Sequence, residues 1–142
     1  MGYNMHCALE ALNKKTEKWE CFEISSAERH YSLFSRIADV CNSEKEEDYI
    51  DPIDTPRGWP GDFSNPAETW RDCFELAFFD TWLSRKELED LDKWLRENNY
   101  EERLSKLLNL KQLSLLFDME SGWKKAAFSK YKDLRVLFFF ER

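Results

Sequence analysis

The chain has 142 residues, of which 42% are hydrophobic, 15% aromatic and 35% charged. A chain of this length can bury roughly 70% of its unfolded surface, so we expect one domain over residues 1–142 and exclude a disordered protein. The formal net charge of −7 argues against a protein that binds polymeric nucleic acid through its phosphates.

The four cysteines, Cys7, Cys21, Cys41 and Cys73, form no C-x-x-C pair and have no histidine at ligand spacing. We therefore expect free thiols, no metal site and no cofactor. No apolar run has transmembrane length, which predicts no membrane association. The N-terminus leads directly into a strand pattern, so we expect a cytoplasmic protein.

An antiparallel hairpin is predicted at the N-terminus. Residues 3–12 alternate between apolar and polar side chains, residues 13–17 are a polar turn, and residues 19–24 are rich in strand-forming types. If the turn centres near Lys14 and Lys15, Cys7 and Cys21 lie almost opposite each other. We interpret them as a packed cross-strand pair rather than a disulfide.

Helices are predicted between the hairpin and the C-terminus. Capping boxes at Ser25–Glu28 and Ser84–Glu87, and Asn65 with Pro66, mark three helix starts. Apolar spacing then predicts helices over residues 27–40, from 65 onward, from about 85 to 97, over 104–116 and over 120–132.

The final segment, residues 133–141, is apolar on both faces after Arg135, which is typical of a strand in the middle of a sheet. Its only expected partners are the strands of the hairpin. The sequence thus predicts an α+β fold in which a three-stranded antiparallel sheet, the N-terminal hairpin plus the C-terminal strand, packs one face against four to five helices.

Residues 51–63, together with Pro66, hold all four prolines and two of the four glycines. We interpret residues 43–65 as a structured loop between helices. Within it, Arg57 and Trp59 suit a ligand with a phosphate and a base. The alternative is that Trp59 plugs the edge of the core while Arg57 pairs with Asp54 or Asp62.

The candidate binding set is completed by Arg29 and His30 at the start of the first helix, and by Asp62 in the loop. A helix start favours an anion, although a solvent-facing first turn is the commoner arrangement for a residue such as His30. The aspartates of the loop could also hold magnesium, but they are common in turns. No hydrolase triad spacing, phosphate loop or metalloprotease motif occurs, so we expect no enzyme.

Four blocks of the sequence recur together in a known family. They are Arg-His-Tyr-Ser-Leu-Phe-Ser-Arg-Ile-Ala-Asp-Val at 29–40, Pro-Arg-Gly-Trp-Pro-Gly-Asp-Phe-Ser at 56–64, Thr-Trp-Leu-Ser-Arg-Lys-Glu-Leu at 81–88 and Leu-Arg-Val-Leu-Phe-Phe-Phe at 134–140. The chain resembles a family of small bacteriophage- and prophage-encoded proteins of unassigned activity. It departs from the family where Phe78-Phe79-Asp80 replaces a histidine-rich approach and Glu141-Arg142 replaces a final Asp-Asn.

The resemblance implies a phage context rather than a reaction, and with it a location in the cytoplasm of the infected host. We therefore predict an accessory protein that counters host antiviral immunity by non-catalytic binding. In one version it sequesters a small anionic ligand, a nucleotide-type immune signal, in a pocket that a homo-oligomer would enclose. In the alternative version it is an acidic inhibitor that binds a host defence or nucleic-acid-binding protein, with the run from Glu44 to Asp48 as its acidic feature.

Overall fold

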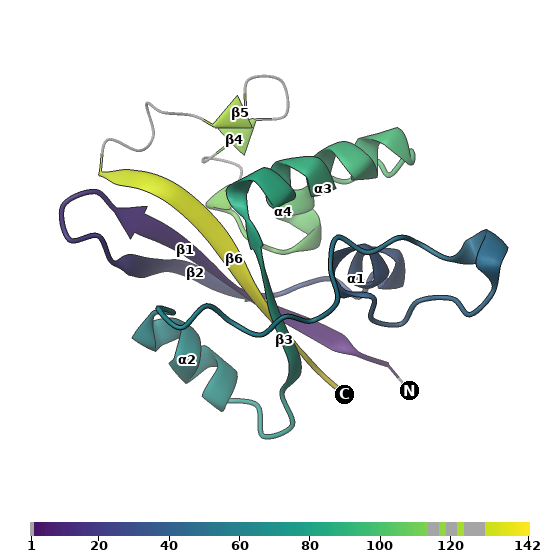
Figure 1. Ribbon diagram of the computed structural model, residues 1–142, viewed down its shortest axis with the longest axis horizontal. Coiled ribbons are helices and arrows are strands. Elements are labelled where there is room, and N and C mark those ends of the chain that lie inside the picture. The colour runs from purple at the N-terminus through teal and green to yellow at the C-terminus, as the bar shows by residue number, and fades with distance from the viewer. Residues whose placement is uncertain (1, 114–116, 119–121, 124–129) are drawn as a thin grey trace.

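The computed structural model describes residues 2–113, 117–118, 122–123 and 130–142. It is an α+β fold with a four-stranded antiparallel sheet (Figure 1), in the order β2-β1-β6-β3. The predicted class is confirmed, but the predicted number of three strands is wrong. Helices cover both faces of the sheet, whereas we expected them on one.

The central strand is β6 (Tyr131–Glu141), which pairs with β1 (Asn4–Asn13) on one side and β3 (Phe78–Ser84) on the other. The hairpin partner of β1, β2 (Trp19–Ser26), lies at one edge. Residues Leu134–Phe140 of β6 are buried, because the strand is flanked by other strands and covered on both faces. The two predicted terminal elements, the hairpin and the last strand, are confirmed.

Strand β3 was not predicted from the sequence. A bulge interrupts its pairing with β6 between Phe78 and Thr81, and Phe79 has a φ of 53°. Only Thr81 and Leu83 then alternate as buried residues, so the two-residue period is too short to stand out from the sequence.

The larger core lies between one face of the sheet and α1 (Tyr31–Ala38), α3 (Arg85–Glu97) and the short α4 (Leu104–Leu107). On the other face, α2 (Asn65–Asp72) and the proline-rich loop cover a smaller cluster. That cluster contains Ala8, Leu137 and Ala67, with Trp59 packed against them. The loop therefore belongs to the second layer of the fold.

Two of the three predicted helix starts are correct. The predicted capping box Ser25–Glu28 is wrong, because Ser25 and Ser26 belong to β2 and α1 begins only at Tyr31. The capping box of Ser84 and Glu87 is present at α3, and α2 begins at Asn65 with Ser64 as its N-cap. The first helix is shorter than predicted, because His30 caps it and Asp39 ends it in the left-handed conformation.

The two predicted helices nearest the C-terminus are not found as such. The first ends at Leu107, followed by Asn109 with a φ of 54°, and residues 114–116 of the prediction lie outside the described residues. Most of the predicted helix 120–132 also lies outside them. Its described part is strand: β5 (Gly122–Trp123) pairs with β4 (Phe117–Asp118), and Tyr131 pairs with Asn13 at the start of β6.

Cys7 and Cys21 are not opposite each other. Leu12 pairs with Trp19, so the turn is centred between Lys15 and Thr16, later in the sequence than predicted. The hairpin also has a bulge between Leu9 and Glu10. As a result, Cys21 pairs with Glu10, and Cys7 pairs with Ser25. Cys7 belongs to the larger core and Cys21 packs against the smaller one, so the sheet separates them. All four cysteines are free. Burial raises the pKa of both the Cys7 and Cys21 thiols.

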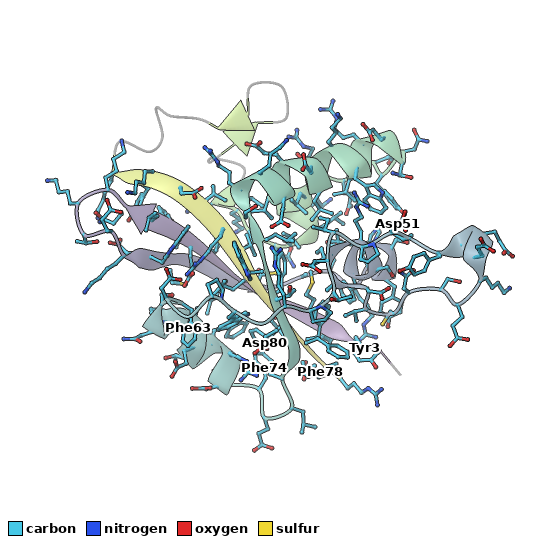
Figure 2. All side chains as sticks on the ribbon, viewed as in Figure 1. Tyr3, Asp51, Phe63, Phe74, Phe78 and Asp80 are labelled. Atoms are coloured by element: carbon cyan, nitrogen blue, oxygen red, sulfur yellow. The ribbon has the colours of Figure 1, made fainter. Side chains whose placement is uncertain are left out.

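The loop between α1 and α2 contains one short 3-10 turn, η1 (Glu46–Asp48). It crosses the edge of the sheet at β3 near Asp80 (Figure 2). There the N–H of Gly58 donates to the carbonyl of Asp80 over 2.7 Å. Within the described ranges, no helix has the length and apolar character needed to span a membrane.

Candidate functional site

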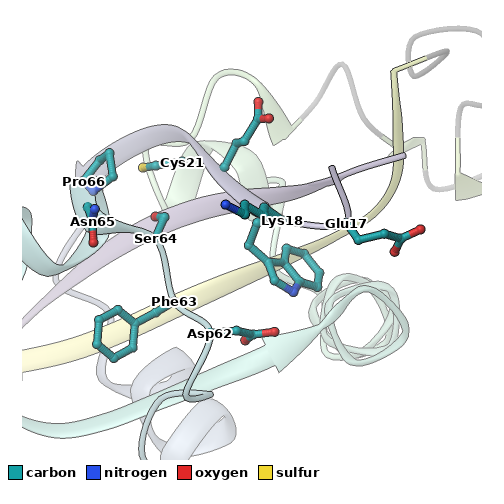
Figure 3. Close-up of a pocket in the computed structure, with 10 residues that line it drawn as sticks. Glu17, Lys18, Cys21, Asp62, Phe63, Ser64, Asn65 and Pro66 are labelled. Carbon is teal, nitrogen blue, oxygen red and sulfur yellow. The ribbon is translucent and has the colours of Figure 1, made fainter. Parts of the chain in front are cut away.

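A pocket of about 470 Å³ lies between the β1–β2 hairpin and the start of α2 (Figure 3). Residues 17–21 form one wall and residues 62–66 the other. The second wall is the end of the proline-rich loop, where Ser64 accepts a hydrogen bond from the N–H of Ala67 and so caps α2. The capped start of α2 and the hairpin strand β2 therefore give the pocket fixed walls.

A buried ion pair holds the loop wall in place. Glu10 and Arg135 are direct cross-strand partners, with 0% and 4% of their surfaces exposed. The Nε–H of Arg135 donates to one oxygen of Glu10 over 2.7 Å, and the other oxygen accepts from the N–H of Ser64 over 2.7 Å. Arg135 also donates to the carboxylate and the carbonyl of Asp62. This network ties the loop to the sheet.

Trp19 connects the ion pair to the pocket. The guanidinium carbon of Arg135 lies 3.9 Å from the centroid of the Trp19 ring, and Trp19 itself lines the pocket. Stacking of this kind stabilises a cation whose other polar atoms are hydrogen-bonded. The arginine is thus enclosed by protein rather than presented to a ligand.

The walls of the pocket carry more negative than positive charge. Glu17, Glu20 and Asp62 line it against Lys18 alone. Hydrogen bonds from Tyr131 and Asn13 lower the pKa of Glu20, and two-thirds of the Asp62 side chain is exposed (66%). Two of these carboxylates are already paired within the protein, Glu17 with Lys132 and Asp62 with Arg135, so the excess of lining carboxylates does not by itself make the pocket a site for a cation.

Arg57 is engaged within the protein. Its guanidinium donates to both oxygens of Glu87, to Asp54 at 3.5 Å and to the carbonyl of Trp82. It also lies 4.5 Å from the centroid of the Trp82 ring. Of the two interpretations of Arg57, the geometry favours pairing with a carboxylate: Asp54 is a predicted partner, while Glu87 was not anticipated.

Trp59 packs into the smaller core. Its indole N–H donates to the carbonyl of Phe138 over 2.9 Å, and its ring meets Phe63 and Phe139 edge-on. This bond reaches β6 next to the bulge of β3, where regular strand pairing is interrupted. Trp59 therefore fills the edge of the smaller core, which is the alternative given for it in the sequence analysis.

Arg29 and His30 lie away from Trp59. His30 accepts a hydrogen bond from the N–H of Leu33 and contacts Tyr100, on the side of the larger core. Arg29 donates to Asn4 over 2.8 Å. Of the five predicted binding residues, Asp62 alone lines the pocket described above, and the sheet stands between His30 and Trp59.

The residues that build the pocket were not part of the predicted set, apart from Asp62. A signal for the ion pair was present, since Glu10 and Arg135 are the charged residues within the apolar segments 7–12 and 134–140. This signal did not identify the pair, because only the register of β1 against β6 places Glu10 opposite Arg135.

No group of three or more His, Cys, Asp or Glu side chains that could hold a metal ion is found in the described part of the chain. The magnesium alternative for the loop aspartates therefore gains no support there. Comparison of the chain with protein-family models, with curated proteins and with solved structures gives no match.

Proposed function

We propose that the protein acts by non-catalytic binding of a basic partner protein through the acidic loop, defined as residues 42–51. The resemblance to phage-encoded proteins supports a host defence or nucleic-acid-binding protein as the target. The observation that carries this proposal is a set of unpaired carboxylates held on a fixed loop around an exposed tyrosine.

The carboxylates belong to Glu44, Glu46, Glu47 and Asp48, which are all exposed and form no ion pair with any described residue. Lys45 is the single basic residue between them. Tyr49 follows, 45% exposed, and burial together with the charges of Asp39 and Asp51 raises its pKa. Tyrosine within a charged rim is typical of protein interfaces.

The loop is fixed by Asn42. Its side-chain oxygen accepts from the N–H groups of Ser43 and Ile50, and its amide donates to Asp39 and to the carbonyl of Ile50. Arg36 in α1 pins the far end by donating to the carbonyl of Asp51 over 2.7 Å. A loop ordered before binding loses less entropy on association, and like charges that repel in the free protein are stabilised by a basic partner.

The test is capture of proteins from a bacterial lysate on the immobilised chain, with salt raised from about 0.1 M to about 1 M, which shortens the Debye length from about 10 Å to about 3 Å. We expect basic proteins to be retained at low salt and released at high salt. The test variant replaces Glu44, Glu46, Glu47 and Asp48 by their amides and should lose the capture.

The matched control replaces four other exposed carboxylates, Glu68, Asp72, Glu75 and Glu101, by amides. It changes the net charge equally, so capture should persist. Equal loss in both variants would reduce the effect to net charge and contradict a specific role for the acidic loop.

Sequestration of a nucleotide-type signal stays a prediction. Its residues are engaged with protein partners as described, so the geometry favours protein capture. Calorimetry with cyclic and linear nucleotides tests it: heat that disappears in Arg57→Ala would favour the nucleotide, and light scattering would show whether a homo-oligomer encloses the site.

A further inference from the structure

Ser26, His6 and Glu141 form a hydrogen-bonded chain on three different strands. Ser26 Oγ lies 2.7 Å from His6 Nδ1, and His6 Nε2 lies 3.2 Å from a carboxylate oxygen of Glu141. His6 pairs with Ser26 across β1 and β2, and Glu141 is at the end of β6. Sequence spacing hides this group, because its members are 20 and 135 positions from the histidine.

The partners fix the tautomer of the ring. An ionised carboxylate accepts hydrogen bonds only, so the Nε2–H of His6 donates to Glu141. Nδ1 is then left with its lone pair and accepts the hydroxyl proton of Ser26. A hydroxyl, a neutral imidazole and an orienting carboxylate in series are the parts of an activated serine nucleophile.

The imidazole is enclosed by aromatic rings. It stacks on Phe74 with ring centroids 4.0 Å apart, and it also contacts Trp70 and Phe139. Only 4% of His6 is exposed. Burial lowers its pKa despite the hydrogen bond and charge of Glu141, so the ring is neutral at physiological pH and able to act as a base.

The two ends of this hydrogen-bonded series, Ser26 and Glu141, differ in their surroundings. Ser26 is exposed on edge strand β2, which places this end beside solvent. Glu141 is held at the other end by the amide of Asn4, which in turn accepts from Arg29. Among the described contacts that His6 makes with β2, β6 and α2, Glu141 is the charged group. Arg29 lies beyond Glu141 and is linked to it through Asn4.

We propose that Ser26 is a nucleophile that reacts with carboxylic esters and related acyl electrophiles, with His6 as its general base and Glu141 as the positioning residue. This activity is separate from the acidic loop. Ser26 Oγ attacks the carbonyl carbon while its proton passes to His6 Nδ1. The ester C–O bond then breaks and the leaving oxygen takes that proton, which leaves an acyl-serine that water hydrolyses by the same route.

The experiment treats the full chain with a fluorophosphonate probe, with which serine attack on phosphorus expels fluoride, and measures the intact mass and the modified peptide. We expect one adduct, on Ser26, and none in Ser26→Ala. With p-nitrophenyl acetate, we expect turnover about 100-fold above that of Ser26→Ala, the low end of general-base catalysis. An unlabelled wild-type protein, or equal labelling of Ser26→Ala, would overturn the proposal.

Ser25→Ala is the matched control. Ser25 is the neighbouring serine on the same strand, and its hydroxyl donates to the carbonyl of Leu108. Labelling of Ser26 should persist in this variant, provided that its urea unfolding midpoint shows a folded protein. Loss of labelling in a folded Ser25→Ala would point to the local structure of the strand rather than to the chain of hydrogen bonds.

Glu141→Gln tests the positioning role by the pH dependence of labelling. In the wild type, the rate should rise with pH to a plateau, with its midpoint below the ordinary pKa of histidine. Because Glu141 raises the pKa of His6, the amide should move this midpoint to lower pH and reduce the plateau about tenfold. An unchanged midpoint and plateau would remove Glu141 from the mechanism.

Discussion

Replacing Arg135 with methionine tests whether the buried ion pair holds the sheet and the loop wall together. The substitution keeps a long side chain but leaves the carboxylate of Glu10, which is 0% exposed, with only the N–H of Ser64 as a described partner. Breaking a buried pair in this way reduces the free energy of unfolding by about 3–5 kcal/mol.

The double variant Glu10→Leu with Arg135→Met should be more stable than Arg135→Met alone. It removes both charges, and its main remaining penalty is the unpaired N–H of Ser64, about 1–3 kcal/mol. Asp62 adds little, because its side chain is 66% exposed and water can replace the arginine.

Urea unfolding measures both variants. With a slope of about 2 kcal/mol per molar urea, a loss of about 4 kcal/mol lowers the midpoint by about 2 M. Lys86→Met is the control, because Lys86 and Asp90 form an exposed pair and should contribute less than about 0.5 kcal/mol. A loss below about 1 kcal/mol in Arg135→Met, or a double variant that is the less stable of the two, would refute the reasoning.

Three further changes test other contacts. Trp59→Phe removes the donor to Phe138 and should reduce the free energy of unfolding by about 1–2 kcal/mol; an unchanged urea midpoint would show that this bond does not brace the sheet edge. Ser84→Ala breaks the capping box of α3 and should reduce it by about 1 kcal/mol, whereas Ser105→Ala, at a site where no such box is present, should not. Burial raises the pKa of Asp92 despite its bonds to Leu104 and Arg103, so in the wild type this group disfavours the folded state once pH rises above the ordinary aspartate value. Asp92→Asn should therefore gain stability relative to wild type at neutral pH and lose that advantage as pH falls below about 4, and urea midpoints that differ equally at both pH values would contradict this account.

The starts of α2 and α3 were predictable because their signals are local. A capping box such as Ser84 with Glu87 satisfies backbone groups within one turn. The same pattern at Ser25–Glu28 misled, because pairing with β1 places Ser25 and Ser26 in β2. The last strand was predictable for a similar reason, since seven consecutive buried residues from Leu134 to Phe140 need cover on both faces.

The candidate site was less predictable. The prolines and glycines indicated a fixed loop, but whether Arg57 faced a ligand depended on Glu87 and Trp82, which lie 30 and 25 positions away. Strand β3 was missed because its bulge at Phe79 breaks the pattern that reveals a strand. Both failures concern contacts between distant segments.

By itself, then, the sequence determined the α+β class, the hairpin, the central last strand and the starts of α2 and α3, because short-range hydrogen bonding and apolar periodicity fix them. The tertiary structure alone decided the fourth strand, the pairing of Glu10 with Arg135 and the line from Ser26 through His6 to Glu141. Strand register and chain crossing bring those residues together, and no spacing along the chain encodes either.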